Sequence, residues 1–457
     1  MELSLGHFGD RRLAACGAAL LGRMMASAGI GVSARRLGGD RAGEVRFGRF
    51  LGNPRVMPQE MIATAAARTE QRVRGRHILV IQDTTSLRDD GEQNSLNLHA
   101  AIALDAYDGS LIGVVDAEFL RRSGGRRDAC GRLPFERKES FRWLAVAHAA
   151  GRLLKAGAAS VTIVADQECD IYDVFARCPE GVDVLVRAHH DRGLTSGGTL
   201  HGCMRRVPIL GREKINVPAA PGRAARTALL TLRARAVRLL RPVRNRVSEM
   251  RKLPPEVPLT LVEAVESRPP RGVAPVRWRL FTSRPVTTLA EARETTRRYR
   301  LRWTVEQVFR TMKTEGFRIE QARTAEGGSF ENLAAATLIA AVSVMQLVHD
   351  RDGTAGRPID DVFTPEERAA LERVNRRLEG GTARQRNPHR RGTLAYGAWV
   401  CARLGGWTGY YGDPGPIVMF RGLRRFRQMR ADAALIHGVG PPSQRTPRSR
   451  GKSLTRA

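Results

Sequence analysis

The chain has 457 residues, with 76 Lys and Arg against 46 Asp and Glu, so its formal charge is +30. At roughly 150 residues per domain, this length predicts about three domains. The hydrophobic share of 42% and the charged share of 27% are typical of a folded protein and exclude collagen-like, coiled-coil and disordered chains. A pI near 11.3 excludes an acidic halophilic enzyme.

Compartment and partners can also be predicted from composition. No apolar run approaches the roughly 18 residues of a spanning helix, and the N-terminus carries Asp10, Arg11 and Arg12 instead of a signal-peptide pattern. We therefore expect a cytoplasmic protein without a membrane partner. Six cysteines without a C-x-x-C pair predict reduced thiols. The charge predicts nucleic acid as the partner, because neutralised phosphates release counterions, although codon bias toward Arg is an alternative source.

The first 70 residues are predicted to be helical. Apolar positions recur at helical spacing through Leu13–Met25 and again through Met61–Ala67. The basic stretch Ala34–Arg49 between them is predicted to be a loop. The next segment, His77–Asp83, is a compact apolar run rich in β-branched residues that ends on a carboxylate, which predicts a buried strand.

Strands and helices then alternate, and a β-rich insertion is predicted over residues 190–275. Before it we expect a hairpin of Leu98–Leu104 and Leu111–Phe119, a helix over Ser140–Leu154, and apolar strands at Ser160–Asp166 and Val182–Arg187. After it we expect a strand at Val276–Thr282, a long helix at Leu289–Thr314, a buried helix at Phe330–Val348, mostly helical structure over 350–435, and a disordered tail from about Gly438.

Two of the predicted strands end on carboxylates, Asp83 and Asp166. Neighbouring strands that end at one sheet edge would bring both side chains together, and their repulsion is tolerated when a hard divalent cation lies between the oxygens. This pattern indicates a phosphoryl-transfer site. The alternative for each Asp alone is a turn or helix-cap residue at the end of a strand.

A third carboxylate lies in the predicted helix Leu289–Thr314. Tyr299, Arg302, Glu306 and Lys313 follow one another at spacings of three, four and seven residues, which return a side chain to nearly the same side of a helix. On spacing alone, a solvated face of salt bridges is the favoured interpretation, because Arg and Glu four residues apart are common on exposed helices.

Together these residues resemble a known family. Asp83, Asp166 and Tyr299-x2-Arg302-x3-Glu306-x6-Lys313 are similar to the DDE triad and the Y-(2)-R-(3)-E-(6)-K signature of transposon-five-like bacterial transposases of the IS-four family. Gln167 departs from the family pattern, which usually has Arg there. Supporting motifs occur in the family's order over roughly residues 8–435, at Gly9-Asp10-Arg11-Arg12, Arg49-Phe50-Leu51, Asn53-Pro54, Gln82–Leu87, Lys138-Glu139-Ser140, Trp143-Leu144, Asp166-x-Glu168-x-Asp170 and Ala402–Trp407.

The resemblance implies an α/β fold with a ribonuclease-H-like mixed sheet core, a β-rich insertion, and flanking N- and C-terminal helical domains. It also implies double-stranded DNA as partner, both terminal inverted repeats and target, bound by a homodimer. The expected divisions are a helical end-binding domain in 1–70, a catalytic core in 71–190 and 276–349, the insertion in 191–275, a helical dimerisation region in 350–435 and a disordered basic tail in 436–457.

The implied activity is metal-dependent DNA cleavage and strand transfer. Asp83, Asp166 and Glu306 would hold two Mg²⁺ ions, for which Mn²⁺ can substitute, to activate the attacking hydroxyl and stabilise the leaving oxygen. Enzymes of this family nick the transposon end, form and reopen a hairpin, and join the 3′-hydroxyl to target DNA.

Further residues are expected to bind DNA. By the resemblance, Tyr299, Arg302 and Lys313 contact phosphates near the scissile bond. Trp278 and Trp303 would stack on a flipped base, so Trp278→Ala should impair hairpin formation more than the first nick; core packing is the alternative for both rings. The other candidate DNA contacts are Arg310 and the N-terminal Arg11, Arg12 and Arg49.

Two other functions compete with transposition. One is a catalytically silent protein that occupies transposon ends and inhibits transposition, which retention of all three carboxylates disfavours. The other is a general ribonuclease-H-like nuclease without strand transfer, in which the Tyr299–Lys313 helix has no evident purpose. His99 is predicted to be a satisfied sheet residue rather than a metal ligand.

Overall fold

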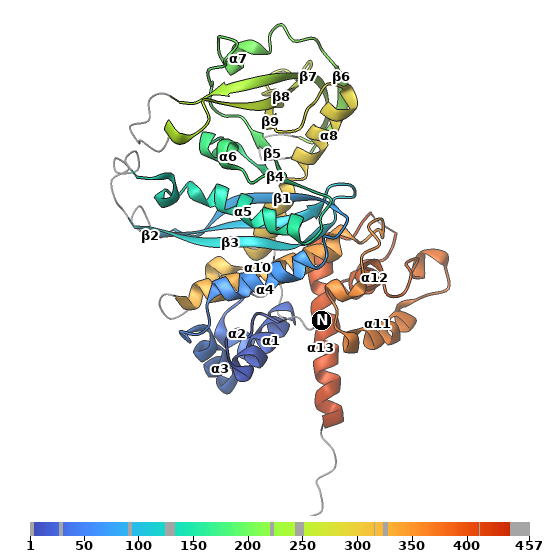
Figure 1. Cartoon of the computed structure of the whole chain (residues 1–457). Helices are drawn as coiled ribbons and strands as arrows, with labels where there is room; N and C mark the ends of the chain where they lie inside the picture. Colours follow the sequence, from blue (N-terminus) through green and yellow to red (C-terminus); the bar gives the residue numbers. More distant parts are fainter. Residues whose placement is uncertain are drawn as a thin grey trace, which may run out of the picture.

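The chain is a mixed α/β protein built around one nine-stranded mixed sheet (Figure 1). The computed structural model describes residues 4–26, 31–89, 94–123, 133–219, 224–242, 251–314, 316–322, 328–410 and 412–438. Among these residues the strand order is β3-β2-β1-β4-β5-β9-β8-β7-β6.

Four helices precede the sheet, as predicted for the first 70 residues. They are α1 (Arg11–Ala26), α2 (Ala34–Gly38), α3 (Arg41–Leu51) and α4 (Pro58–Glu70). The prediction of a loop over Ala34–Arg49 is wrong. Two caps begin helices there, because the side chains of Ser33 and Asp40 accept hydrogen bonds from the backbone N–H groups of Arg36 and Gly43.

The first part of the sheet holds the predicted strands. An antiparallel unit is formed by β1 (His77–Asp89), β2 (Asn94–Asp105) and β3 (Leu111–Ser123), and β4 (Ser160–Ala165) and β5 (Val182–Arg187) continue parallel to β1. The prediction that this strand ends on Asp83 is wrong. The strand continues because β2 still pairs with it beyond this point, with Asp83 opposite Ala100 and Asp89 opposite Ser95.

The region predicted to be a β-rich insertion extends the same sheet (top of Figure 1). Its strands β6 (Gly211–Val217), β7 (Arg226–Leu240) and β8 (Glu256–Glu266) pair antiparallel, and β8 pairs with the predicted strand β9 (Arg277–Thr282). Because β9 also pairs with β5, the two halves of the sheet are continuous. Two short helices, α6 (Tyr172–Arg177) and α7 (Leu200–Cys203), flank β5 in the chain.

Helices cover both faces of the first part of the sheet. Successive strand residues point to opposite faces, so Ile78 and Val80 pack toward α5 (Phe141–Lys155). Leu79 and Ile81 belong to the core shared with α4, α9 (Trp303–Met312) and α10 (Gly328–His349). The helix α10 (Gly328–His349) is long and apolar enough to cross a membrane, but 94% of its most apolar 18-residue segment is buried inside the protein. It is the buried helix predicted over Phe330–Val348.

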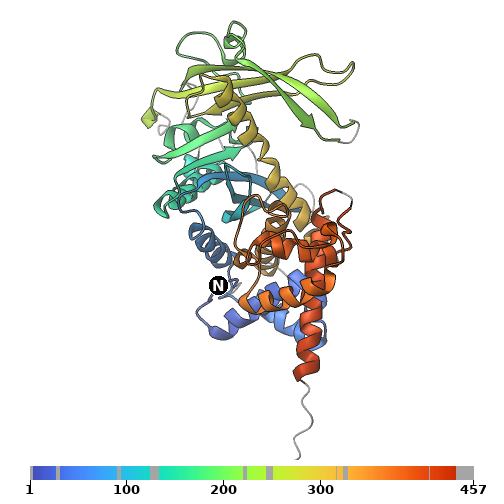
Figure 2. The same cartoon turned by 90° about the vertical axis from the view of Figure 1, so that its right-hand side faces the viewer.

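The prediction of a single helix over Leu289–Thr314 is wrong. Two helices, α8 (Leu289–Arg300) and α9 (Trp303–Met312), run in succession from the insertion strands toward the lower helices (Figure 2). Between them the N–H groups of Arg302 and Val305 bond to carbonyls only three residues earlier, at 3.0 and 3.2 Å. This tighter turn interrupts the α-helical pattern.

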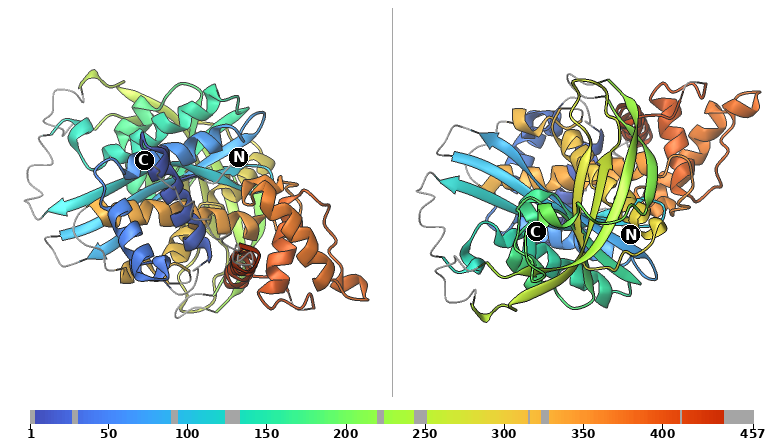
Figure 3. Two further views of the ribbon diagram at one scale, coloured as in Figure 1. Left: turned by 90° about the horizontal axis from the view of Figure 1, so that it is seen from below. Right: turned by 90° about the horizontal axis from the view of Figure 1, so that it is seen from above.

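The C-terminal part is mostly helical, as predicted. The helices α11 (Pro365–Leu378) and α12 (Leu394–Leu404) lie to one side of the sheet, and α13 (Pro416–Gly438) packs on α12 (Figure 3). The tail predicted to be disordered lies outside the described residues beyond 438. Short 3-10 helices lie at Phe135–Arg137, Gln167–Cys169, Ile319–Gln321, Ile359–Asp361 and Ala383–Gln385.

Candidate active site

The sheet brings Asp83 and Asp166 to the same level of two neighbouring strands. Asp166 follows β4 directly, and the parallel register pairs Ile81 with Val164, so each Asp lies two residues beyond this pair. Both side chains are partly exposed. Asp166 also caps the 3-10 turn after β4, since its Oδ1 accepts the N–H of Glu168 at 2.9 Å. The capping role and closeness to Asp83 therefore coexist in this residue.

The helix α9 adds Glu306 and Arg302 to this edge. It packs on β1 and β2, with Val305, Val308 and Phe309 in the core beneath it. The Arg302 guanidinium donates to Asp83 Oδ2 at 2.7 Å and also to Glu306 Oε1, one turn further along α9. Arg302 thus bridges two of the three predicted catalytic carboxylates.

Burial and the neighbouring negative charges raise the pKa of the Asp83 carboxyl. Burial raises the pKa of its carboxyl to about 6, against the opposing effects of Arg302 and of the Thr84 N–H that donates to Asp83 Oδ1 at 2.8 Å. The charges of Asp166 and Glu306 raise it further, which means that both lie within electrostatic reach. The three acidic groups therefore form one electrostatically coupled cluster.

The chemistry of this cluster fits a hard divalent cation. All three side chains offer carboxylate oxygens, which Mg²⁺ and Mn²⁺ prefer over nitrogen and sulfur ligands. Across the described residues, however, no group of three or more acidic, His or Cys side chains is close enough to hold a metal ion. Arg302 supplies the compensating positive charge between Asp83 and Glu306.

The other predicted site residues of the α8–α9 segment take different environments. Tyr299 is 6% exposed and packs edge-on against the Trp278 ring, with 6.0 Å between ring centroids. Trp303 is 43% exposed and carries the Arg310 guanidinium 4.9 Å from its ring centroid. Lys313 follows α9 and pairs with Glu320 at 2.9 Å. Trp278 and Trp303 therefore differ, one packed on Tyr299 and one exposed.

The N-terminal candidates lie apart from the insertion strands. Arg11 and Arg12 begin α1 and Arg49 lies in the last turn of α3, and all three are exposed. The N-terminal helices and the insertion strands occupy opposite ends of the molecule in Figure 1. These three arginines can be reached by a ligand but are carried by elements other than those that hold the carboxylates.

A polar layer behind Asp83 was not foreseen from the sequence. Gln82 and Thr84 point to the α5 side of β1, where both contact His99, and Arg142 of α5 contacts Thr84. His99 is buried and edge-on to Trp143, in agreement with its predicted role in the sheet. Gln82 and Thr84 are polar and two residues apart in a strand, so they share one face, and this spacing is the sequence signal that could have indicated the layer.

Part of the chain that forms this site matches a known protein family. Residues 144–343 match the family model described as the transposase DDE domain. This stretch of the chain is similar to a transposase DDE domain. The matched span includes Asp166 and Glu306 but begins after Asp83. A DDE domain implies DNA as the substrate and DNA cleavage and strand transfer as the chemistry, and enzymes of this type generally use divalent metal ions.

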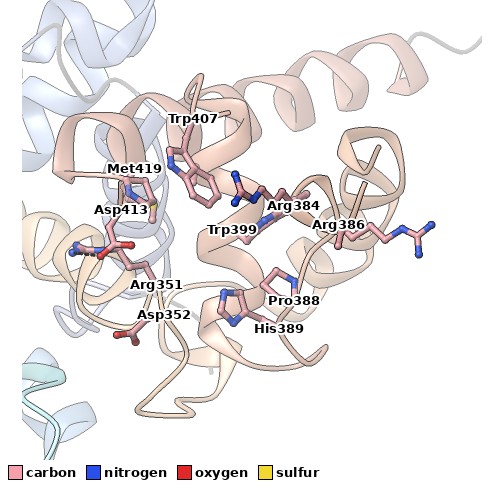
Figure 4. Close-up of a pocket in the computed structure, with 13 residues that line it drawn as sticks. Arg351, Asp352, Arg384, Arg386, Pro388, His389, Trp399, Trp407, Asp413 and Met419 are labelled. Atoms are coloured by element: carbon pink, nitrogen blue, oxygen red, sulfur yellow. Dashed lines mark ion pairs between the residues drawn. The ribbon is translucent and has the colours of Figure 1, made fainter. Parts of the chain in front are cut away.

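A cavity of about 230 Å³ lies outside the DDE match, among the C-terminal helices (Figure 4). Its walls include Trp399, Trp407, Arg384, Arg386 and Asp352. None of the predicted site residues lines it. The cavity is therefore separate from the carboxylate cluster.

Proposed function

We propose that this protein is a metal-dependent cut-and-paste DNA transposase of the IS-four type, with a ribonuclease-H-like catalytic core. The observation that carries the proposal is the electrostatic cluster of Asp83, Asp166 and Glu306 beside Arg302. Two of these carboxylates, Asp166 and Glu306, lie within the span that matches the DDE model. The third comes from a strand whose register sets it level with Asp166.

In this proposal Asp83, Asp166 and Glu306 hold two Mg²⁺ ions, or Mn²⁺ in their place. When bound, the ions would activate the attacking hydroxyl and stabilise the leaving oxygen. The protein contributes position: β1 and β4 carry the two aspartates side by side, and α9 presents Glu306 from above. Arg302, released from the carboxylates, would bind a DNA phosphate with its planar guanidinium.

The surrounding residues suit DNA. Lys313 and Arg310 offer positive charge along the end of α9, and Tyr299 supports the Trp278 ring. We propose the exposed Trp303 as the face on which a flipped base stacks during hairpin formation, since its indole is 43% exposed. Arg11, Arg12 and Arg49 are proposed to contact the transposon ends, bound by a homodimer in the cytoplasm.

The test is a cleavage assay on DNA that carries the element's own ends. Wild-type protein should produce nicked and then hairpinned ends only when Mg²⁺ is present, and Glu306→Ala should abolish both products. Glu372→Ala is the matched control, because Glu372 is also a helical glutamate, in α11, with one 3.9 Å contact to Arg391. Products are resolved on native and denaturing gels.

Two results would point to other functions. Ends that are retarded in gels by wild-type protein but never cut would support the silent end-binding protein. Cutting of any DNA without dependence on the ends would support a general nuclease. Either result would overturn the transposase proposal.

A further inference from the structure

Arg142 lies on the face of the sheet opposite the Arg302 bridge. It is the second residue of α5, and only 7% of it is exposed. Adjacent residues of a strand point to opposite faces. Asp83 contacts Arg302 beside α9, and the side chain of Thr84, the next residue, contacts Arg142 on α5.

The Arg142 guanidinium reaches two segments of the chain at once. Its Nε donates to Thr84 Oγ1 at 3.3 Å, and its Nη2 donates to Glu168 Oε2 at 3.2 Å. Its Nη1 is held by the backbone carbonyl of Glu139 at 2.9 Å, within the turn that begins α5. One side chain therefore links α5, β1 and the 3-10 turn after β4.

The two residues that Arg142 holds are the two that orient the aspartates. The backbone N–H of Thr84 donates to Asp83 Oδ1 at 2.8 Å. The backbone N–H of Glu168 donates to Asp166 Oδ1 at 2.9 Å. Each aspartate is thus one hydrogen bond away from a residue whose side chain is bound by the same guanidinium.

The hydrogen bonds behind Thr84 continue from Arg142 through His99 to Gln82. Because arginine only donates, the Thr84 hydroxyl accepts from Arg142 and can donate to His99 Nδ1 at 2.9 Å. His99 Nε2 lies 3.2 Å from Gln82 Oε1, which can accept its proton in the tautomer whose Nδ1 accepts from Thr84. Burial, together with the nearby Arg142 charge, lowers the pKa of His99 to about 3, so the imidazole is neutral near pH 7.

We propose that Arg142 is a positioning residue that sets the separation of Asp83 and Asp166 for shared binding of a divalent cation. This inference rests on the proposed function of the two aspartates as metal ligands. Two carboxylates without a cation between them repel, so the segments that carry them need a link that resists their separation. A planar guanidinium can hold an oxygen of each segment simultaneously, whereas the point charge of lysine cannot reproduce that geometry.

The experiment measures Mn²⁺ binding to the full chain by the EPR signal of free Mn²⁺, with the thermal midpoint recorded for each variant. Arg142→Met should weaken Mn²⁺ binding about 10-fold or more, the usual effect of losing a residue that orients metal ligands. Arg142→Lys should fall between this variant and wild type. The Mg²⁺ concentration for half-maximal nicking should rise in parallel, while affinity for the DNA ends stays unchanged.

Arg152→Met is the matched control, because Arg152 lies on the same helix and pairs with Glu70 at 3.2 Å. It should bind Mn²⁺ like wild type. Should Arg142→Met fail to fold, Glu168→Ala breaks the same link at a side chain that is 59% exposed, and it should weaken Mn²⁺ binding several-fold. If a folded Arg142→Met or Glu168→Ala variant binds Mn²⁺ with wild-type affinity, the inference about Arg142 is wrong, but the proposed function is not affected. A wild-type protein that neither binds Mn²⁺ nor cuts DNA would overturn the proposed function itself.

Discussion

At the scale of single residues, the site is held by contacts between distant parts of the sequence. Arg302 and Asp83 are 219 residues apart, yet they form a 2.7 Å ion pair that joins the start of α9 to β1. Residue types and spacing predicted the carboxylates. They could not predict that Arg302 bridges two of them, because that contact depends on how α9 lies across the sheet.

Removing the Arg302 charge should expose the repulsion between the carboxylates. Its side chain and that of Asp83 are each 17% exposed, so we expect Arg302→Gln to lower the free energy of unfolding by about 1–3 kcal/mol in metal-free buffer. Mg²⁺ should restore part of this loss, since it can supply the missing positive charge. Urea unfolding with and without Mg²⁺ checks this, and equal stability of variant and wild type would contradict it.

The buried His99 should make stability depend on pH. Its pKa is about 3 in the folded chain and 6.5 when unperturbed, so the unfolded chain binds more protons between these values. Stability is therefore retained above pH 6.5 and falls as the pH is lowered toward 3. At pH 5 the unfavourable protonation of His99 lowers the free energy of unfolding by about 2 kcal/mol relative to pH 7.5, and the His99→Gln protein should not show this decrease. Urea unfolding at pH 7.5 and 5.0 measures the difference; parallel changes in both proteins would argue against it.

Trp303 allows hairpin formation to be separated from nicking. Because its ring is exposed, Trp303→Ala should leave the thermal midpoint unchanged. Loss of one base stack is worth about 1–3 kcal/mol, so hairpin formation should slow about 5-fold to 150-fold while the first nick keeps its rate. Time courses on pre-nicked and intact ends provide the comparison. A nick slowed as much as the hairpin would speak against a stacking role.

At the scale of elements, strands were predicted better than helix boundaries. Short apolar runs rich in β-branched residues, such as Ser160–Ala165, predict buried strands, and the structure contains a strand over these residues. The break between α8 and α9 could not be predicted, because Leu301 and Arg302 keep helical backbone angles and only the hydrogen bonds tighten. The helix α3 was missed because its basic residues lie on a solvent-exposed side, while Phe47 and Phe50 face the core.

The crossing of α12 and α13 depends on a glycine. A Cβ atom at Gly422 would lie 1.6 Å from the carbonyl oxygen of Cys401, so Gly422→Ala must push the helices apart. We expect a loss of about 1–3 kcal/mol, typical of overpacking. Gly22→Ala in α1 meets nothing within 4 Å and should be neutral or stabilising by about 0.5–1 kcal/mol. Thermal unfolding of both variants tests this, and a Gly422→Ala protein as stable as wild type would refute the close crossing.

At the scale of the whole molecule, a continuous sheet joins the carboxylate cluster to the insertion strands and the helices around it. The charge of +30 gives the chain a general attraction for DNA, which cannot distinguish a transposase from a silent end-binding protein. The DDE match and the three coupled carboxylates favour catalysis. The central claim is therefore that one cluster both cuts DNA and joins it.

Strand joining tests this claim most directly. A pre-cut donor end with a labelled 3′-hydroxyl is incubated with the protein, a supercoiled target plasmid and Mg²⁺, and covalent transfer of the label is measured. The wild-type protein should join the end to the plasmid, and Asp83→Asn, Asp166→Asn and Glu306→Gln should each fail while still binding the donor. Joining that persists in any of these three variants, or a wild-type protein that binds the end and never joins it, would contradict the account.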